Sequence, residues 1–197
     1  MVQHITDGTF RDDDWYGDAL AGDNYTQCEF QRVDLTEATS QGVVFEECRF
    51  GNVRFNASVH TESAFIRCEF NRCELFDAEF TDCKFVGSVF RDTGLRPLTI
   101  TGGDWSYVGL AGADLRGVTI TGARMREADL GGANCENATI RDVDLSGATL
   151  AKTNLTGADL RGTDLTALEP VQAQIRRAKI NSAQAIVVAQ ALGFVVD

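Results

Sequence analysis

Two polar side chains stand out by their spacing, because Ser40 and His60 are 20 residues apart in a chain that has only two histidines. A serine hydroxyl beside an imidazole is the pairing that activates a nucleophile. A third group, usually a carboxylate, must also orient the imidazole. The pair therefore raises an enzymatic hypothesis, which depends on the elements that position the two side chains.

Cysteine offers a second possible chemistry. Cys28, Cys48 and Cys68 repeat at the same 20-residue interval. A ladder of thiols would suit a metal or redox site, but neither a CxxC spacing nor a neighbouring histidine accompanies it. Thiols also act as small hydrophobic groups that fill narrow spaces. We favour the packing interpretation and expect no metal and no cofactor.

The elements that must hold these residues follow a period of five. Of the 33 positions divisible by five from Ile5 to Leu165, 31 are apolar, and they include ten of the twelve Phe. The two exceptions are Ser40 and His60. A second series of mostly small residues lies two positions earlier in each unit. A period of five matches neither a helix nor a strand, so every unit must contain a turn.

This period decides how the Ser–His pair is interpreted. Both residues occupy the large inward position, where no inward carboxylate is available to orient His60. Buried polar groups normally hydrogen-bond to one another. We therefore interpret Ser40 and His60 as a core pair and expect that the protein is not an enzyme.

The units with the clearest pattern are residues 113–117 (ADLRG), 128–132 (ADLGG) and 158–162 (ADLRG). They resemble the pentapeptide-repeat family, and the resemblance extends over roughly residues 23–180. It implies an all-β fold, a right-handed quadrilateral β-helix with four units per coil. Residues 20 apart would then stack, and we expect ladders of Phe30, Phe50, Phe70 and Phe90 and of Phe45, Phe65, Phe85 and Trp105. At a strand spacing of about 4.8 Å the rod would be about 38 Å long.

Both ends depart from the pattern. Asp13, Asp18 and Asp23 occupy small inward positions, so we interpret residues 1–22 as a degenerate first coil or N-terminal cap. Residues 181–197 predict a short C-terminal α-helix over 183–192, with Ser182 as N-cap and Gly193 as its stop. An open solenoid end needs a cover. We expect this segment to cover the end and to form a dimer through Ile186, Val187, Val188, Leu192 and Phe194.

Composition and charge exclude several classes of protein. The chain has 197 residues, 44% of them hydrophobic, and a net charge of −11. This charge argues against direct binding of nucleic acid and favours a basic partner. No apolar run could span a membrane, and the polar start lacks the features of a signal peptide, so we expect a cytoplasmic protein without membrane contact. The acids just before a large residue are weak candidates for partner contact: Asp114, Asp129, Asp144, Asp159 and Asp164.

Within this family, three stretches resemble the fluoroquinolone-resistance proteins in particular: residues 87–90 (GSVF), 95–99 (LRPLT) and 144–148 (DLSGA). This resemblance implies a homodimer joined at the C-termini that imitates double-stranded DNA, binds DNA gyrase and protects it from quinolones or natural gyrase poisons. The dimer would carry about one charge per 3.5 Å, half the density of duplex DNA. The alternative is a structural scaffold that binds a partner other than gyrase.

Overall fold

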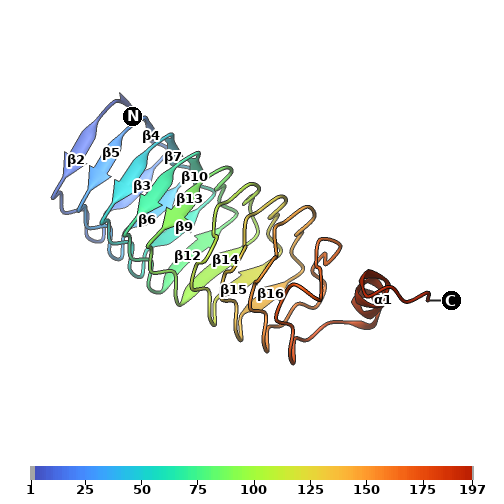
Figure 1. The fold of residues 1–197 in the computed structure, drawn as a ribbon. Coiled ribbons are helices and arrows are strands. Elements are labelled where there is room, and N and C mark those ends of the chain that lie inside the picture. The colour runs from blue at the N-terminus through green and yellow to red at the C-terminus, as the bar shows by residue number, and fades with distance from the viewer. Residues whose placement is uncertain (1–2, 197) are drawn as a thin grey trace.

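Residues that are 20 apart in the sequence lie side by side along a rod of stacked, four-sided coils (Figure 1). The computed structural model describes residues 3–196. All sixteen strands pair in parallel and in 20-residue register, for example Phe30 with Phe50 and Phe50 with Phe70. The predicted right-handed quadrilateral β-helix with a short C-terminal helix is thus confirmed.

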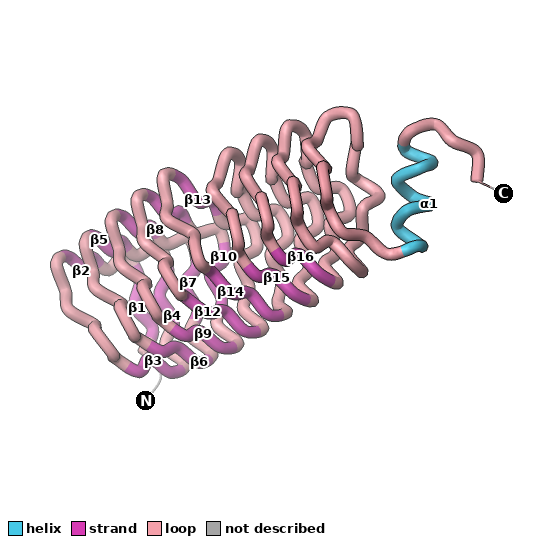
Figure 2. Tube along the Cα trace, turned by 90° about the horizontal axis from the view of Figure 1, so that it is seen from below, coloured by secondary structure: helices cyan, strands magenta, loops and turns pink. Residues whose placement is uncertain are grey.

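Three sides of the rod carry short strands, and the fourth is held by isolated bridges such as Asp14–Asp34 and Arg54–Glu74. Figure 2 shows how the strands line these sides and become fewer toward the C-terminal half, where turns predominate and only the third side keeps strands. The first side contains β1 (His4–Thr6), β4 (Asn24–Thr26), β7 (Val44–Glu46) and β10 (Ala64–Ile66). The second contains β2 (Thr9–Arg11), β5 (Glu29–Gln31), β8 (Arg49–Gly51), β11 (Glu69–Asn71) and β13 (Val89–Arg91). The third contains β3 (Ala19–Ala21), β6 (Thr39–Gln41), β9 (Val59–Thr61), β12 (Ala78–Thr81), β14 (Leu98–Thr101), β15 (Thr119–Thr121) and β16 (Thr139–Arg141).

The core consists of the predicted ladders. The rings of Phe30 and Phe50 stack with centroids 4.8 Å apart, and those of Phe70 and Phe90 with centroids 4.5 Å apart. On the neighbouring side the ladder ends with Trp105, stacked at 3.9 Å on Phe85. Each ring is buried between its neighbours above and below, and such burial stabilises the fold by roughly 1.5–3 kcal/mol per side chain.

The turn that the period requires occurs at the second residue after each large inward one. Every non-glycine residue with positive φ occupies this corner position, and most glycines with positive φ do too. Its N–H donates to a carbonyl of the next coil, as Asp12 does to Gln31 at 2.9 Å. Left-handed backbone costs a residue with a Cβ about 1–2 kcal/mol. The corner hydrogen bonds and the buried ladders together offset this cost.

Gly103 also has a positive φ but does not lie at a corner, because it occupies the small inward position two residues before Trp105. Its φ is +80°, and a Cβ there would overlap the carbonyl oxygen of Cys83. Only glycine permits this close approach of two coils.

Residues 3–22, interpreted from the sequence as a degenerate first coil or N-terminal cap, carry the three strands β1, β2 and β3. These strands pair in register with the second coil. The side chain of Asp18 is exposed and those of Asp13 and Asp23 are partly exposed, while Asp23 accepts a hydrogen bond from the Gln3 N–H at 2.9 Å. The small inward position opens to solvent at the end of the rod, so a carboxylate is tolerated there.

Helix α1 (Ser182–Ala191) begins one residue earlier than predicted. Its N-cap is Asn181 rather than Ser182, because the Asn181 side chain accepts from the Gln184 N–H while the Gln184 side chain accepts from the Asn181 N–H. Gly193 follows the helix with φ +88°. No helix in residues 3–196 is long and apolar enough to cross a membrane.

The last coil is closed at one corner by a single side chain. Gln184 is the only buried residue of α1, and its Nε2 donates to the carbonyls of Leu160 and Thr163 at 2.7 Å each. Its Oε1 accepts from the Gly162 N–H at 3.3 Å. The carboxamide thus replaces the peptide group that a further coil would supply. The rest of α1 stands beyond the rod (Figure 1), so it covers the end less completely than we expected.

Replacing Gln184 with Glu should lower the free energy of unfolding by about 1–3 kcal/mol, because two buried carbonyls lose their donor. Urea unfolding at neutral pH measures the change. Gln190→Glu is the control, because Gln190 is exposed on the same helix and should change stability by no more than about 0.5 kcal/mol. Equal losses in the two variants would contradict the assigned role of Gln184.

Candidate functional site

The five candidate acids of the C-terminal half are all engaged in the turns of the coil. Each carboxylate accepts the N–H of the residue two positions later, at distances between 2.9 and 3.4 Å. The side chain therefore shapes the backbone that follows it. These residues are Asp114, Asp129, Asp144, Asp159 and Asp164.

Three of these five carboxylates also pair with arginine. Asp114 binds Arg96 and Arg116, at 2.8 and 2.7 Å. The Ser146 hydroxyl, which donates at 2.6 Å, and the guanidinium of Arg126 lower the pKa of Asp144 to about 2. A fork of two hydrogen bonds from Arg161 lowers the pKa of Asp159 to about 2. These carboxylates are ionised at neutral pH, but much of their charge is neutralised locally.

The uncompensated charge lies at the other end of the rod. Residues 1–82 contain 17 Asp and Glu against 6 Arg, whereas residues 83–197 contain 12 acidic and 12 basic residues. Within the described part of this acidic segment, four carboxylates form ion pairs: Asp12, Asp34, Glu46 and Glu47. The whole net charge of −11 therefore belongs to the first four coils.

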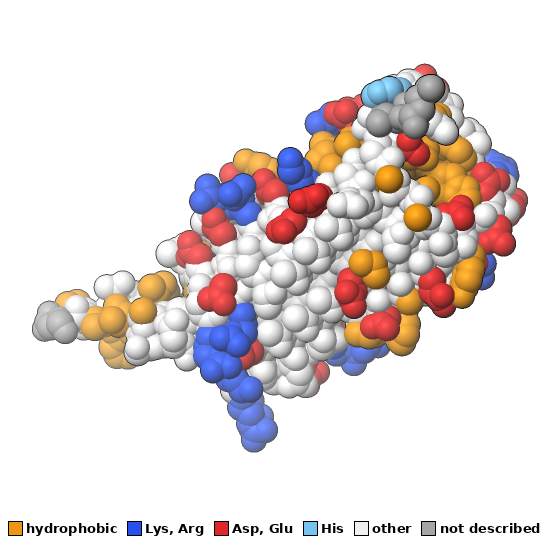
Figure 3. Space-filling model, turned by 180° about the vertical axis from the view of Figure 1, so that it is seen from behind, with side chains coloured by type: hydrophobic (Ala, Val, Ile, Leu, Met, Phe, Trp, Pro, Cys, Tyr) orange, Lys and Arg blue, Asp and Glu red, His pale blue; other side chains and the backbone are white. Residues whose placement is uncertain are grey.

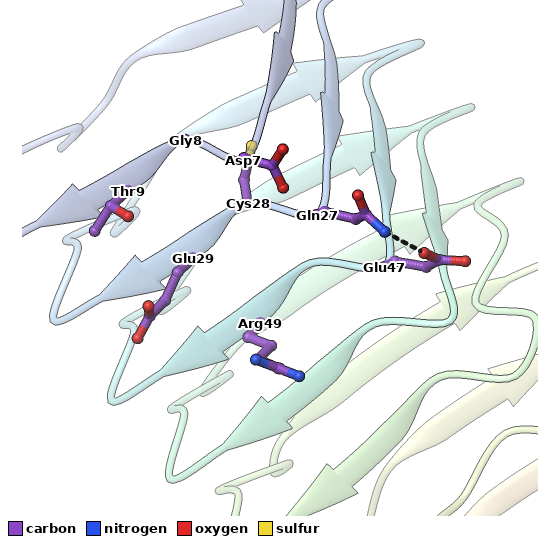
Figure 4. A pocket seen from close by; sticks show the side chains of 8 residues that line it. All are labelled: Asp7, Gly8, Thr9, Gln27, Cys28, Glu29, Glu47 and Arg49. Atoms are coloured by element: carbon purple, nitrogen blue, oxygen red, sulfur yellow. Dashed lines mark hydrogen bonds between the residues drawn. The ribbon is translucent and has the colours of Figure 1, made fainter.

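An open groove of about 500 Å³ runs along one corner of this acidic segment (Figure 4). Asp7, Gln27 and Glu47 line one edge, and Gln27 Nε2 donates to Glu47 Oε2 at 3.1 Å. Glu29 and Arg49 line the other edge. Three acids and one arginine line the groove, and no group of three metal-ligating side chains forms among residues 3–196. The groove thus offers a charged contact surface rather than a converging set of catalytic groups.

The six cysteines lie in the interior as free thiols. On one side, each thiol donates to a carbonyl of the preceding coil, Cys48 to Tyr25 at 3.4 Å and Cys68 to Phe45 at 3.3 Å. Burial raises the pKa of Cys73 and of Cys83 to about 11, so these thiols stay protonated and unreactive. Their observed role is to fill the narrow inward position.

The residues proposed for the dimer lie on α1 and the tail beyond it. Ile186, Leu192 and Phe194 are 46%, 47% and 65% exposed, whereas Val187 and Val188 are half-buried. Val188 packs partly against the core of the rod. Figure 3 shows hydrophobic side chains along this protruding segment. An exposed apolar segment of this kind is typical of an interaction surface.

Ser40 and His60 are hydrogen-bonded neighbours inside the rod. Ser40 Oγ lies 2.7 Å from His60 Nδ1, and His60 Nε2 lies 2.9 Å from Ser58 Oγ. The Ser58 hydroxyl donates its proton to the carbonyl of Phe55, so Nε2 must carry the imidazole proton and Nδ1 must accept from Ser40. Ser58 thus takes the place that an orienting carboxylate would have in a catalytic triad.

Burial decides what this pair can do. The side chains of Ser40 and His60 are 3% and 2% exposed, and the imidazole stacks at 4.8 Å on Phe80, which continues the ladder. A substrate therefore has no access to the hydroxyl. Burial lowers the pKa of His60 to about 3, so the imidazole is neutral and matches the two hydrogen bonds it makes.

The buried imidazole should make stability dependent on pH. Between pH 6.5 and about 3 the unfolded chain takes up a proton that native His60 refuses, so acid favours unfolding. The free energy of unfolding should fall by up to about 1.4 kcal/mol for each pH unit in this window. His60→Leu should remove this part of the dependence and remain within about 1 kcal/mol of the parent at pH 7, because Ser40 can still donate to Ser63, 2.8 Å away.

Urea unfolding at pH 7 and pH 5 measures this effect. His4→Leu is the control, because His4 is the other histidine and is exposed. A parallel pH profile for the parent and His60→Leu would show that His60 is not the source.

Comparisons with known proteins agree with this architecture. The family model for pentapeptide repeats matches residues 61–92, 100–132 and 128–166, with eight copies of the repeat. Over 94 residues the chain is 36% identical to the pentapeptide repeat protein MfpA of Mycobacterium tuberculosis. This alignment covers 48% of the chain and 51% of MfpA, so it spans about half the length of that relative.

Two solved structures of QnrB1, a plasmid-mediated fluoroquinolone resistance protein, share the fold along the whole rod. They superpose with TM-scores of 0.71 and 0.69 at 17% and 19% identity, and cover 98% and 100% of this chain and 100% of QnrB1 in each case. At this identity the similarity shows the fold alone. The stacked coils, the five-residue units and the family match to half of the sequence together show that the chain belongs to the pentapeptide-repeat family.

Proposed function

We propose that this protein binds DNA gyrase as a mimic of DNA, modulates its activity and protects it from quinolones or natural gyrase poisons. The observation that carries the proposal is the charge of the first four coils. Eleven net negative charges along about 19 Å of rod give about one charge per 1.7 Å, the linear density of duplex DNA. A basic surface that holds DNA would attract such a rod.

The similarity to MfpA and the shared fold with QnrB1, a fluoroquinolone resistance protein, support the same assignment. The charge is not uniform along the rod, since the DNA-like density belongs to residues 1–82 and residues 83–197 carry no net charge. Residues 1–82 would therefore imitate the charge of duplex DNA, whereas the whole rod would imitate its shape. A gyrase partner would place the protein in the cytoplasm.

The C-terminal segment supports a homodimer. Ile186, Leu192 and Phe194 expose apolar surface that no other part of residues 3–196 covers, and the last coil is closed only in part. A second copy would bury this surface. The two nearly neutral halves would then meet at the centre, and the two acidic segments would lie at the far ends. Such an arrangement also keeps the like charges of the two copies apart.

Neutralising three acids of the first four coils should weaken inhibition of gyrase supercoiling by about tenfold at low salt, because fewer charges attract the enzyme. The changes are Glu62→Gln, Asp77→Asn and Asp82→Asn, all at exposed corners. The matched control changes three exposed corners of the nearly neutral half, Asp92→Asn, Glu127→Gln and Asp142→Asn.

Supercoiling measured with and without a quinolone gives the readout. Failure of the parent protein to bind or inhibit gyrase at low salt would contradict the proposed function and favour a scaffold for another partner. Equal weakening by both sets of changes would contradict the role of the acidic segment.

Changing Ile186 and Phe194 to Asp should convert the dimer to monomers, because each charge would be buried in the apolar contact. Sedimentation velocity measures the state. Phe76→Asp is the control, because Phe76 is 58% exposed in the fourth coil, far along the rod from α1, and should leave the dimer intact. A dimer that survives the double change would show that another surface joins the copies.

A further inference from the structure

The N-terminal end of the rod is an apolar surface that nothing within residues 3–196 covers. We call its four large side chains the end plate: Ile5, Phe10, Trp15 and Leu20. All four are half-buried, whereas their counterparts one coil further on, Tyr25, Phe30 and Leu35, are at most 5% exposed. The end plate packs on the core from one side and is open on the other. Figure 3 shows hydrophobic side chains exposed near this end.

The same end presents backbone donors without acceptors. In the second coil, the N–H groups of Glu29, Asp34 and Thr39 donate to carbonyls of the first coil. The equivalent N–H groups of Thr9, Asp14 and Ala19 have no acceptor among residues 3–196. A free strand edge of this kind can pair with an added extended segment.

The charge around the end plate decides what can cover it. We call the aspartates of the first coil the collar: Asp7, Asp12, Asp13, Asp14 and Asp18. Arg11 is the only Lys or Arg in the same coil, so this coil carries a net charge of −4. A second copy docked end to end would bring two such collars together, and nucleic acid would meet the same repulsion. A basic partner is attracted.

We propose that the end plate and the collar bind an extended basic segment of a partner protein, in which Lys or Arg side chains flank an apolar residue. The backbone of the segment adds to the free strand edge, its apolar residue contacts Trp15 and Phe10, and its cations pair with the collar. The inference stands apart from gyrase binding, because it rests on the end of the rod rather than on its length.

Trp15 supplies a built-in probe. The chain has two tryptophans, and the other, Trp105, is 1% exposed in the core. Trp105→Phe leaves Trp15 as the only tryptophan, whose emission is excited selectively at wavelengths that tyrosine does not absorb. Phe suits a ladder that already contains Phe85, and the change also removes an indole Nε1 that has no hydrogen-bond partner in the described structure. A short peptide that alternates Lys with Val should shift the emission of Trp15. A peptide that alternates Glu with Val should not, and added salt should weaken the binding of the Lys peptide.

Two variants locate the binding. Asp13→Asn, Asp14→Asn and Asp18→Asn together should weaken binding of the Lys peptide at least tenfold, and Asn can still form the side-chain turn that Asp14 makes with the Tyr16 N–H. Leu20→Ser removes part of the end plate and should also weaken binding. The control is the Asp92→Asn, Glu127→Gln, Asp142→Asn protein, which should bind as the parent does.

Three results would overturn the proposal. The first is equal binding of the Lys and Glu peptides, and the second is unchanged affinity in both the collar and Leu20 variants. The third is a collar variant that forms end-to-end oligomers in sedimentation while its peptide affinity is unchanged, because the aspartates would then serve only to keep rods from stacking.

Discussion

Every residue of the rod has the same kind of neighbour, the residue 20 positions away. The parallel hydrogen bonds between coils impose this rule, and almost everything else depends on it. A large side chain must stack on another large one, as Phe50 does on Phe30 and Phe70. A polar side chain in the interior must find its partner at the same distance, as Ser40 does in His60. The left-handed corner is the geometric condition for closing each coil, and the chain accepts it even where the residue is not glycine.

The same rule explains how much could be predicted. A strict period reports the inward positions directly, so the ladders, the inward thiols and the Ser–His contact could be inferred from spacing alone. Where the rule ceases to apply, at the two ends, prediction was weaker. Asp13, Asp18 and Asp23 occupy small inward positions, and the period alone does not show that their side chains are partly or fully exposed at the end of the rod. The helix start was placed one residue too late because Ser182 and Asn181 are both good caps, and only the reciprocal bonds of Gln184 decide between them.

The acidic residues have different surroundings in the two parts of the rod, which the total composition does not reveal. Acids of the C-terminal half, such as Asp114 and Asp159, hold turns and pair with arginines, so their charge is used within the molecule. Residues 1–82 contain an excess of Asp and Glu that the arginines of the same segment do not neutralise. A net charge of −11 therefore describes neither half. Charge per unit length describes the rod better, because it changes from a value like that of duplex DNA over residues 1–82 to nearly zero over the rest of the chain.

Gln184 has a consequence for how such rods change in length. One carboxamide satisfies donors and acceptors at a corner of the final coil, so the closing helix is held by the backbone of residues 160–163 and by the apolar contact of Val188 with the core. Insertion or deletion of a complete coil upstream would present the same backbone to the same side chain. The same closing helix can therefore end a rod of any number of coils. The length of the rod, from the apolar C-terminal segment to the acidic N-terminal coils, can change during evolution by one coil at a time while both ends stay the same.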